Sequence, residues 1–84
     1  MNTSVIDENK YLISADLALV TTLSLFFPIQ SIDKSIPRKA QFVFQKTREL
    51  EQAVSDYWQQ KLSVEPQAYF NQLKFIKARL YSQE

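Results

Sequence analysis

The feature that most limits the fold of this chain is the complete absence of glycine from its 84 residues. Average usage would supply roughly six. Nucleotide-binding phosphate loops and dinucleotide-binding turns need glycine where the backbone approaches a phosphate closely, so both classes of site are excluded. A hairpin turn must also be built without glycine. In the hairpin predicted below, Asp33 or Ser35 would have to supply the local hydrogen bonding.

Cysteine and histidine are absent as well. Their absence removes thiolate nucleophiles, disulfides, imidazole acid–base catalysis and almost every kind of zinc site. Glu49 and Glu51 are two residues apart, so they do not share a helix face and make a poor acid–base pair. No group of residues meets the needs of nucleophile, base and oxyanion stabilisation. We therefore expect a protein that is not an enzyme and has no catalytic residue, metal or cofactor.

The length and composition indicate one small folded domain. Hydrophobic residues make up 45% of the chain, and 11 residues are aromatic, which is a globular rather than a disordered composition. We expect a mobile tail over residues 1–9 and one compact domain over residues 10–84. A chain this short buries a smaller fraction of its surface than a longer chain does, so a partner or self-association would help to stabilise it.

The most hydrophobic segment, residues 17–29, is too short to span a membrane. It has thirteen residues, includes three hydroxyl side chains and ends near Pro28, whereas a spanning helix needs about twenty apolar residues. The acidic residues before it do not fit a secretion signal. We expect a buried helix in a cytoplasmic protein that does not bind membranes.

The first half of the domain predicts a strand, a helix and a hairpin. Ser14 is the expected N-cap of the helix, with Asp16 in its first turn, and Pro28 ends it. Because Phe42 and Phe44 are two residues apart, they share one face of a strand. The predicted elements are a strand over 10–13, a helix over 15–27, strands over 29–33 and 40–45, and a loop over 34–39 between these strands.

The second half predicts two helices. Thr47 caps a helix over residues 48–62, which has acids in its first turn and Lys61 in its last. Pro66 lies in the first turn of a third helix that ends at about Ser82. The expected core-facing stripes are Leu50, Val54, Tyr57 and Trp58 on one helix, and Tyr69, Leu73, Ile76 and Leu80 on the other. The predicted fold is α+β, in the order β-α-β-β-α-α, with a small antiparallel sheet packed against three helices.

Positive charge gathers in two blocks although the net charge is only +1. The first block surrounds the hairpin and contains Lys34, Arg38, Lys39, Lys46 and Arg48. In one interpretation Arg38 and Lys39 contact phosphates, with the other cations around them. In the other, the charges guard a strand edge against edge-to-edge pairing. Both interpretations stay open at this point.

The second basic block lies on the last helix. At 100° per residue, Phe70, Lys74, Lys77 and Tyr81 fall within about 60° of one another. Alternating cations and aromatic rings are typical of sites for single-stranded nucleic acid, in which cations meet phosphates and rings stack on bases. Alternatively, Phe70 and Tyr81 pack against the preceding helix while the lysines extend into solvent. The need of a small domain to bury its aromatic residues favours this second interpretation.

The chain also resembles a family of short uncharacterised prokaryotic proteins classed only as a domain of unknown function. The segments that carry the resemblance are SADLALVTTL (14–23), IDKSIPRKAQFVF (32–44), YW (57 and 58) and VEPQAYFNQLKFIKARLY (64–81). The resemblance implies a compact α+β domain. It implies no activity, ligand or catalytic residue.

Two functions remain as hypotheses. The first is a small binding module for nucleic acid, and its candidate residues are Lys34, Arg38, Lys39, Lys74 and Lys77. The second is a protein-interaction adaptor or a self-associating protein that uses Trp58, Phe70 and Tyr81. Steep salt dependence would indicate nucleic acid, and sensitivity to loss of Trp58 would indicate a protein partner.

Overall fold

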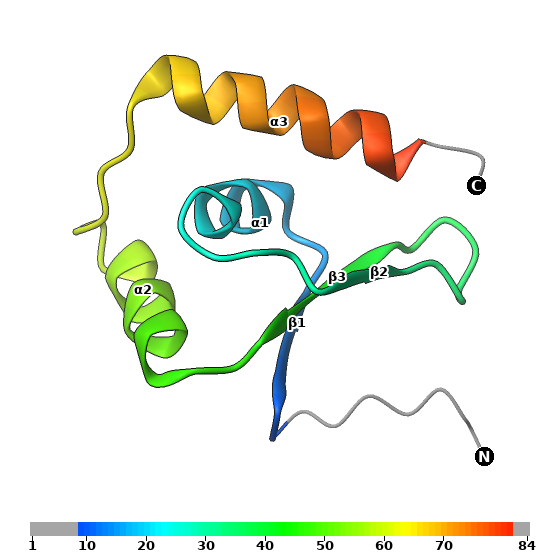
Figure 1. Ribbon diagram of the computed structural model, residues 1–84, viewed down its shortest axis with the longest axis horizontal. Coiled ribbons are helices and arrows are strands. Elements are labelled where there is room, and N and C mark those ends of the chain that lie inside the picture. Colours follow the sequence, from blue (N-terminus) through cyan, green and yellow to red (C-terminus); the bar gives the residue numbers. More distant parts are fainter. Residues whose placement is uncertain (1–8, 82–84) are drawn as a thin grey trace.

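The computed structural model describes residues 9–81 and has the α+β architecture and the element order expected from the sequence (Figure 1). The elements are β1 (Tyr11–Ser14), α1 (Leu17–Ser24), β2 (Ser31–Asp33), β3 (Gln41–Gln45), α2 (Arg48–Trp58) and α3 (Pro66–Leu80). The tail expected over residues 1–9 lies outside the described residues, except for Asn9, which forms a turn with Lys10.

The three strands form one antiparallel sheet in the order β1-β3-β2, so Tyr11 belongs to the sheet. In the central strand, Phe42 and Phe44 are both almost completely buried. Leu12 lies opposite Phe44, and Ile32 lies opposite Phe42. These four side chains share one face because side chains alternate along each strand. The predicted common face of the two phenylalanines is confirmed.

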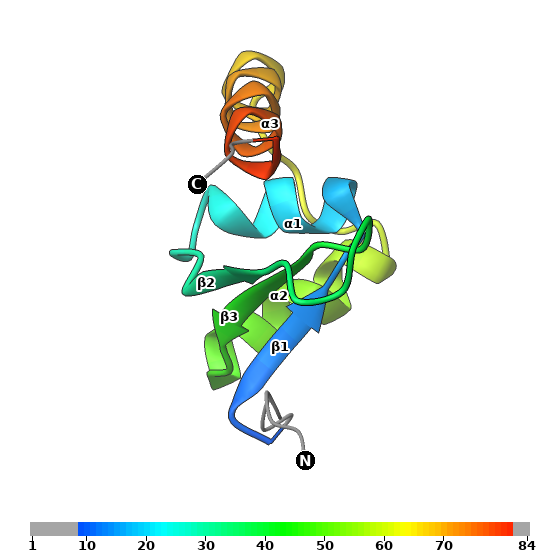
Figure 2. The ribbon, with the colours of Figure 1, turned by 90° about the vertical axis from the view of Figure 1, so that its right-hand side faces the viewer.

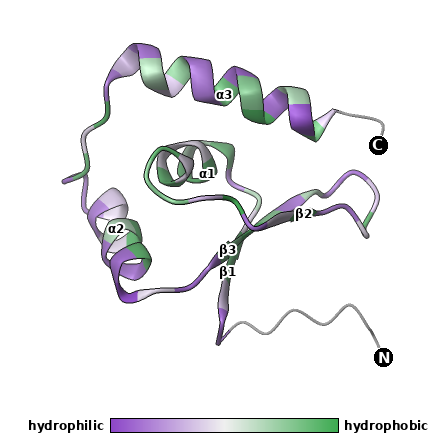
Figure 3. Cartoon of the chain, viewed as in Figure 1, coloured by the Kyte–Doolittle hydropathy of each residue, from purple (hydrophilic) through white to green (hydrophobic). Residues whose placement is uncertain are grey.

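The helices build two further layers on that face. α1 lies between the sheet and α3, while α2 flanks the sheet beside α1 (Figures 1 and 2). Residues 19–23 of α1 are five consecutive buried positions, so this helix is buried on more than one side, as its apolar sequence predicted. The colouring of Figure 3 shows mainly hydrophobic residues in α1 and alternating hydrophobic and hydrophilic residues in α3.

The predicted N-cap of α1 is wrong by two residues. Asp16 is the cap, because its carboxylate accepts hydrogen bonds from the backbone N–H groups of Ala18 and Leu19. Ser14 instead ends β1, opposite Phe42, and its hydroxyl accepts a hydrogen bond from the Asp16 N–H at 3.1 Å. Both side chains suit a cap, but pairing with β3 holds Ser14 in the sheet.

α2 begins as predicted and ends four residues earlier. Thr47 caps it by accepting a hydrogen bond from the Leu50 N–H at 3.1 Å. The helix ends at Trp58, so Lys61 does not lie in its last turn. Two hydrogen bonds, from Gln60 N–H to Tyr57 C=O and from Lys61 N–H to Asp56 C=O, close the end in a Schellman motif.

The apolar stripe of α2 is narrower than predicted. Leu50 is buried, and Val54 and Tyr57 are partly buried, which confirms three of the four positions. Trp58 is 62% exposed and is not part of the core. Its ring meets the ring of Tyr57 edge-on, with 5.0 Å between the centroids.

α3 begins and packs as its sequence predicts. Pro66 occupies the first turn, and the Glu65 carboxylate caps the helix by accepting a hydrogen bond from the Ala68 N–H at 2.7 Å. Ile76 is buried against the core, and the other three stripe residues are partly buried. The Gln72 amide donates a hydrogen bond to the Ser24 hydroxyl at 3.0 Å, which joins α3 to α1.

Candidate nucleic-acid interface

The loop between β2 and β3 is shaped by side-chain hydrogen bonding in the absence of glycine. The Asp33 carboxylate accepts a hydrogen bond from the Ser35 N–H at 2.9 Å, which confirms the predicted role of these two residues. This backbone hydrogen bond, together with one from the Ser35 side chain, lowers the pKa of Asp33 below its ordinary value of 3.8. The start of the loop is therefore held by an ionised aspartate.

The tip of the loop is a β-turn with arginine in a position that usually carries glycine. The Lys39 N–H donates to the Ile36 carbonyl at 3.1 Å, so Pro37 and Arg38 are the two central residues. Arg38 has a φ of 66°, whereas the ring of Pro37 restricts its φ to about −65°. This combination is a type II turn. A left-handed backbone costs a non-glycine residue about 1–2 kcal/mol, so Arg38 holds its place at an energetic disadvantage.

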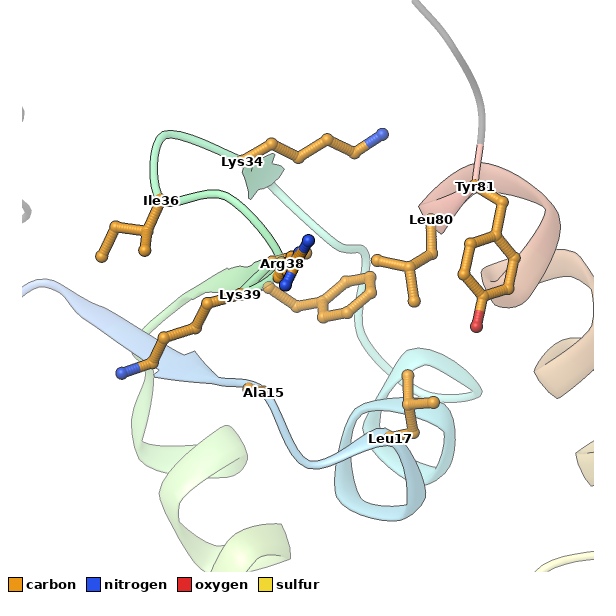
Figure 4. Close-up of a pocket in the computed structure, with 10 residues that line it drawn as sticks. Ala15, Leu17, Lys34, Ile36, Arg38, Lys39, Leu80 and Tyr81 are labelled. Carbon is orange, nitrogen blue, oxygen red and sulfur yellow. The ribbon is translucent and has the colours of Figure 1, made fainter.

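An open pocket of about 480 Å³ lies beside this loop (Figure 4). Three parts of the chain that are distant in sequence form it: the hairpin loop with the start of β3, the residues that lead into α1, and the end of α3. The lining residues are Ala15, Leu17, Lys34, Ile36, Arg38, Lys39, Ala40, Phe42, Leu80 and Tyr81. The lining thus has three cationic side chains and no acidic one.

Lys34 ties the hairpin to the last helix. Its ammonium group donates a hydrogen bond to the Arg79 backbone carbonyl at 3.3 Å. The last carbonyls of a helix carry partial negative charge, and a cation placed there is stabilised. In Figure 4 the side chain of Lys34 reaches towards the end of α3, where Leu80 and Tyr81 lie. Lys34 therefore helps to hold two walls of the pocket together.

Arg38 and Lys39 are exposed and available to a ligand. Within residues 9–81, neither side chain makes a hydrogen bond or an ion pair. Figure 4 shows Arg38 between Lys34 and Lys39, and Lys39 extends to the side of the pocket away from Tyr81. All three cations lie in the loop, not on a strand. Lys34 directly follows the edge strand β2, so the interpretation that the charges guard a strand edge stays open beside phosphate contact.

The other two cations of the first basic block lie elsewhere. Lys46 follows β3, and Arg48 is the first residue of α2. Phe42 of β3 lines the pocket, and Lys46 lies four residues beyond it, which is on the order of 14 Å at about 3.4 Å per residue. The basic block that is continuous in sequence is thus divided between the two ends of the central strand.

The basic and aromatic stripe of α3 faces solvent. Phe70 is 59% exposed, Tyr81 is 72% exposed, and Lys74 and Lys77 are also exposed. The interpretation that the two aromatic rings pack against the preceding helix is wrong, because α3 packs on α1 instead. The Phe70 ring contacts the ring of Tyr69 edge-on at 5.5 Å. The Tyr69 ring therefore contacts the Phe70 ring but leaves most of it exposed to solvent.

Tyr81 connects the stripe to the pocket. It lines the pocket, and its N–H bonds to the Lys77 carbonyl at 3.0 Å, one helical turn earlier. One end of the molecule therefore brings together four of the candidate residues: Lys34, Arg38, Lys39 and Tyr81. Lys77, Lys74 and Phe70 lead away from that end along α3, whereas Trp58 lies on α2 (Figure 1).

The apolar wall of the pocket was not predicted from the sequence. Leu17 comes from the start of α1, Leu80 from the end of α3, and Ile36 from the hairpin loop. Each fits its local pattern as an ordinary apolar residue. Only the packing of α3 on α1 brings the first two together, so no local signal marks them as pocket residues.

A cluster of acidic side chains or a long apolar helix would indicate two other kinds of site. Among residues 9–81, no three acidic side chains gather closely enough to hold a metal ion. In the same range, no helix has both the length and the apolar character needed to cross a membrane.

The family of the chain follows from its match over almost its whole length. The family described as Domain of unknown function (DUF5659) matches residues 8–82, which include every helix and strand described above. Neither the curated proteins nor the solved structures contain a match to the chain. The chain therefore belongs to the DUF5659 family.

Proposed function

We propose that this protein is a non-enzymatic binding module for single-stranded nucleic acid. The observation that carries the proposal is the position of Tyr81, which belongs both to the cationic pocket and to the exposed stripe of α3. A strand laid along this surface would meet Arg38 and Lys39 at the pocket, and then Lys77 and Lys74. The exposed rings of Tyr81 and Phe70 would lie between these cations.

The chemistry of this surface suits a flexible single strand. Lysine and arginine side chains neutralise phosphates without reading the sequence. Aromatic rings stack on unpaired bases, whose faces are exposed only when the strand is not in a duplex. The proposal includes the cytoplasmic location expected from the sequence, where such strands are accessible.

Salt dependence of binding tests the proposal. We expect a fluorescein-labelled single-stranded oligonucleotide to bind with an affinity that falls as salt rises. A plot of the logarithm of the association constant against the logarithm of the salt concentration should have a slope of about −0.7 for each phosphate neutralised. The double variant Arg38→Ala, Lys39→Ala should weaken binding at low salt and reduce the slope by about 1.4. Fluorescence anisotropy measures both quantities, and circular dichroism checks that the variant is folded.

The matched control removes two exposed cations outside the proposed surface. Lys10 lies before β1, and Lys61 follows α2, so Lys10→Ala with Lys61→Ala lowers the net charge by the same amount. We expect it to leave the slope unchanged. If both double variants weaken binding equally, only general charge attraction operates. No retention of any oligonucleotide at low salt would refute the proposal.

A protein-interaction role is the second candidate, and the exposure of Trp58 favours it. Large aromatic side chains dominate many protein interfaces, and this indole is mostly uncovered. Of the candidate partner residues, Trp58 is the last residue of α2, Phe70 lies on α3, and Tyr81 caps the end of α3. Binding of a protein partner, or self-association, should respond to Trp58→Ala and vary little with salt. Nucleic-acid binding should be unaffected by that change.

A further inference from the structure

We propose that the pocket beside the hairpin receives a nucleotide with a terminal phosphate monoester, as found at the end of a single strand or in a free nucleoside monophosphate. This inference rests on the proposed function and adds a preference for phosphorylated ends. It concerns the pocket alone, whereas the stripe of α3 would contact the rest of a strand.

The shape and lining of the pocket suit such a ligand. Its volume of about 480 Å³ falls within the range typical of small-molecule sites. Leu17 and Leu80 provide an apolar wall on which a base can lie, and Tyr81 adds an aromatic ring beside them. The stripe of α3 is exposed along a helix, but the pocket is lined by three separate parts of the chain. A concave site suits a single nucleotide better than a continuous strand.

The charges of the pocket suit a monoester better than a diester. A phosphate monoester carries a charge of about −1.5 to −2 near neutral pH, whereas each phosphate inside a strand carries a single charge. Three cations and no acid line the pocket. Lys34 already donates to the Arg79 carbonyl, so Arg38 and Lys39 are the side chains that we assign to the phosphate. The guanidinium of Arg38 can donate two parallel hydrogen bonds to phosphate oxygens.

The backbone of Arg38 supports this assignment. Its left-handed conformation would suit glycine better, yet the turn carries the side chain best able to bind a phosphate. Backbone strain of this kind gathers at functional sites. Gln60 is the other non-glycine residue with positive φ in the described chain, at 62°, and it lies outside the pocket lining. These two residues form a natural pair for a test.

The experiment compares a linear single strand that carries a 5′ or 3′ phosphate with a circular strand of the same sequence. Anisotropy competition at fixed salt gives the relative affinities. We expect the phosphorylated linear strand to bind at least tenfold more tightly than the circle. Adenosine monophosphate should displace the linear strand, and adenosine or inorganic phosphate alone should do so at least tenfold less effectively.

Two variants test whether the pocket causes the preference. Arg38→Gly removes the guanidinium in a backbone conformation that glycine tolerates, and Gln60→Gly makes the same kind of change away from the pocket. Both proteins should unfold at a urea concentration no lower than that of the wild type. Arg38→Gly should lose the tenfold preference, and Gln60→Gly should keep it.

The outcomes separate this inference from the proposed function. Equal binding of linear and circular strands would overturn the terminal site and leave the single-strand module intact. A folded Arg38→Gly protein that keeps the preference would also overturn it. If neither strand binds, the proposed function fails, and the terminal site fails with it.

Discussion

At the scale of single residues, the two left-handed positions show how a fold without glycine is built. Gln60 closes the end of α2, and Arg38 forms the hairpin turn. Both positions would ordinarily favour glycine, so each residue bears a conformational cost. At Gln60 the conformational cost belongs to the Schellman motif that ends α2, which many helices share. The cost at Arg38 places a cation beside a pocket, which is why we assign function to one and structure to the other.

Thr21 provides a prediction at the same scale. Its hydroxyl is completely buried in α1 and has no hydrogen-bond partner among residues 9–81. A buried polar group without a partner costs about 1–3 kcal/mol. Thr21→Val replaces the hydroxyl by a methyl group of similar size and should raise the free energy of unfolding by about 1 kcal/mol. Urea denaturation measures the change.

Thr22 is the matched control for this prediction. It is also buried in α1, but its hydroxyl donates a hydrogen bond to the Ala18 carbonyl at 2.9 Å. Thr22→Val removes that bond, so we expect no gain in stability. An equal gain in both variants would show that added apolar surface, not the unpaired hydroxyl of Thr21, is the cause.

At the scale of elements, the hairpin should be sensitive to acid through Asp33. Its pKa in the folded protein lies below 3.8, chiefly because the Ser35 N–H donates to its carboxylate. The folded state thus binds the proton more weakly than the unfolded state does. The stabilisation is fully present above pH 3.8 and is lost as the pH falls through the lowered pKa of the folded state.

The Asp33→Ala variant tests this effect. It should be less stable than the wild type near neutral pH, and the difference should shrink as the pH falls below 3.8. Urea denaturation over a series of pH values gives the two curves. A difference that stays constant with pH would show that the turn depends on the shape of Asp33 and not on its charge.

The elements themselves could largely be predicted from the sequence, whereas the start of α1 and the end of α2 could not. The alternation of Phe42 and Phe44 and the spacing of residues 69–80 depend on local periodicity, which the fold preserves. Ser14 and Asp16 could each have been the N-cap of α1. Pairing of Ser14 with β3 left this position to Asp16. The exposure of Phe70 followed from the packing of α3 on α1, which no local pattern encodes.

The candidate site divides in the same way. The cations of the hairpin could be recognised because they are neighbours in sequence. The pocket could not, since Leu17 and Leu80 are brought to it from opposite ends of the chain. The place of Tyr81 on a helix face predicts it as a candidate, but its position in the pocket lining depends on where α3 ends.

At the scale of the whole molecule, the third layer depends on one fully buried side chain. Ile76 is the buried residue of α3, and it joins the core formed by the sheet and α1. Removing a buried isoleucine side chain typically costs about 2–5 kcal/mol. Domains of this size have a narrow margin of stability, so Ile76→Ala should remove a large part of it.

Phe75 supplies the control for this whole-molecule prediction. It precedes Ile76 on the same helix but is mostly exposed. Phe75→Ala should therefore change the free energy of unfolding by less than about 0.5 kcal/mol. Alanine favours a helix more than either side chain that it replaces, so a loss of stability cannot come from helix propensity. Thermal denaturation of the two variants distinguishes anchoring of the layer from a general effect of shortening a side chain on α3. Similar destabilisation by both changes would contradict the assigned role of Ile76.

The strand order β1-β3-β2 has a consequence for synthesis of the chain. Both edge strands precede the central strand in sequence, and their backbone partner is β3. As the chain leaves the ribosome, neither edge can pair until residues 41–45 have emerged. The apolar α1 segment is made before the surface that covers it. The sheet therefore assembles in one late step, and translation that stops before β3 would release a chain with its most hydrophobic segment uncovered.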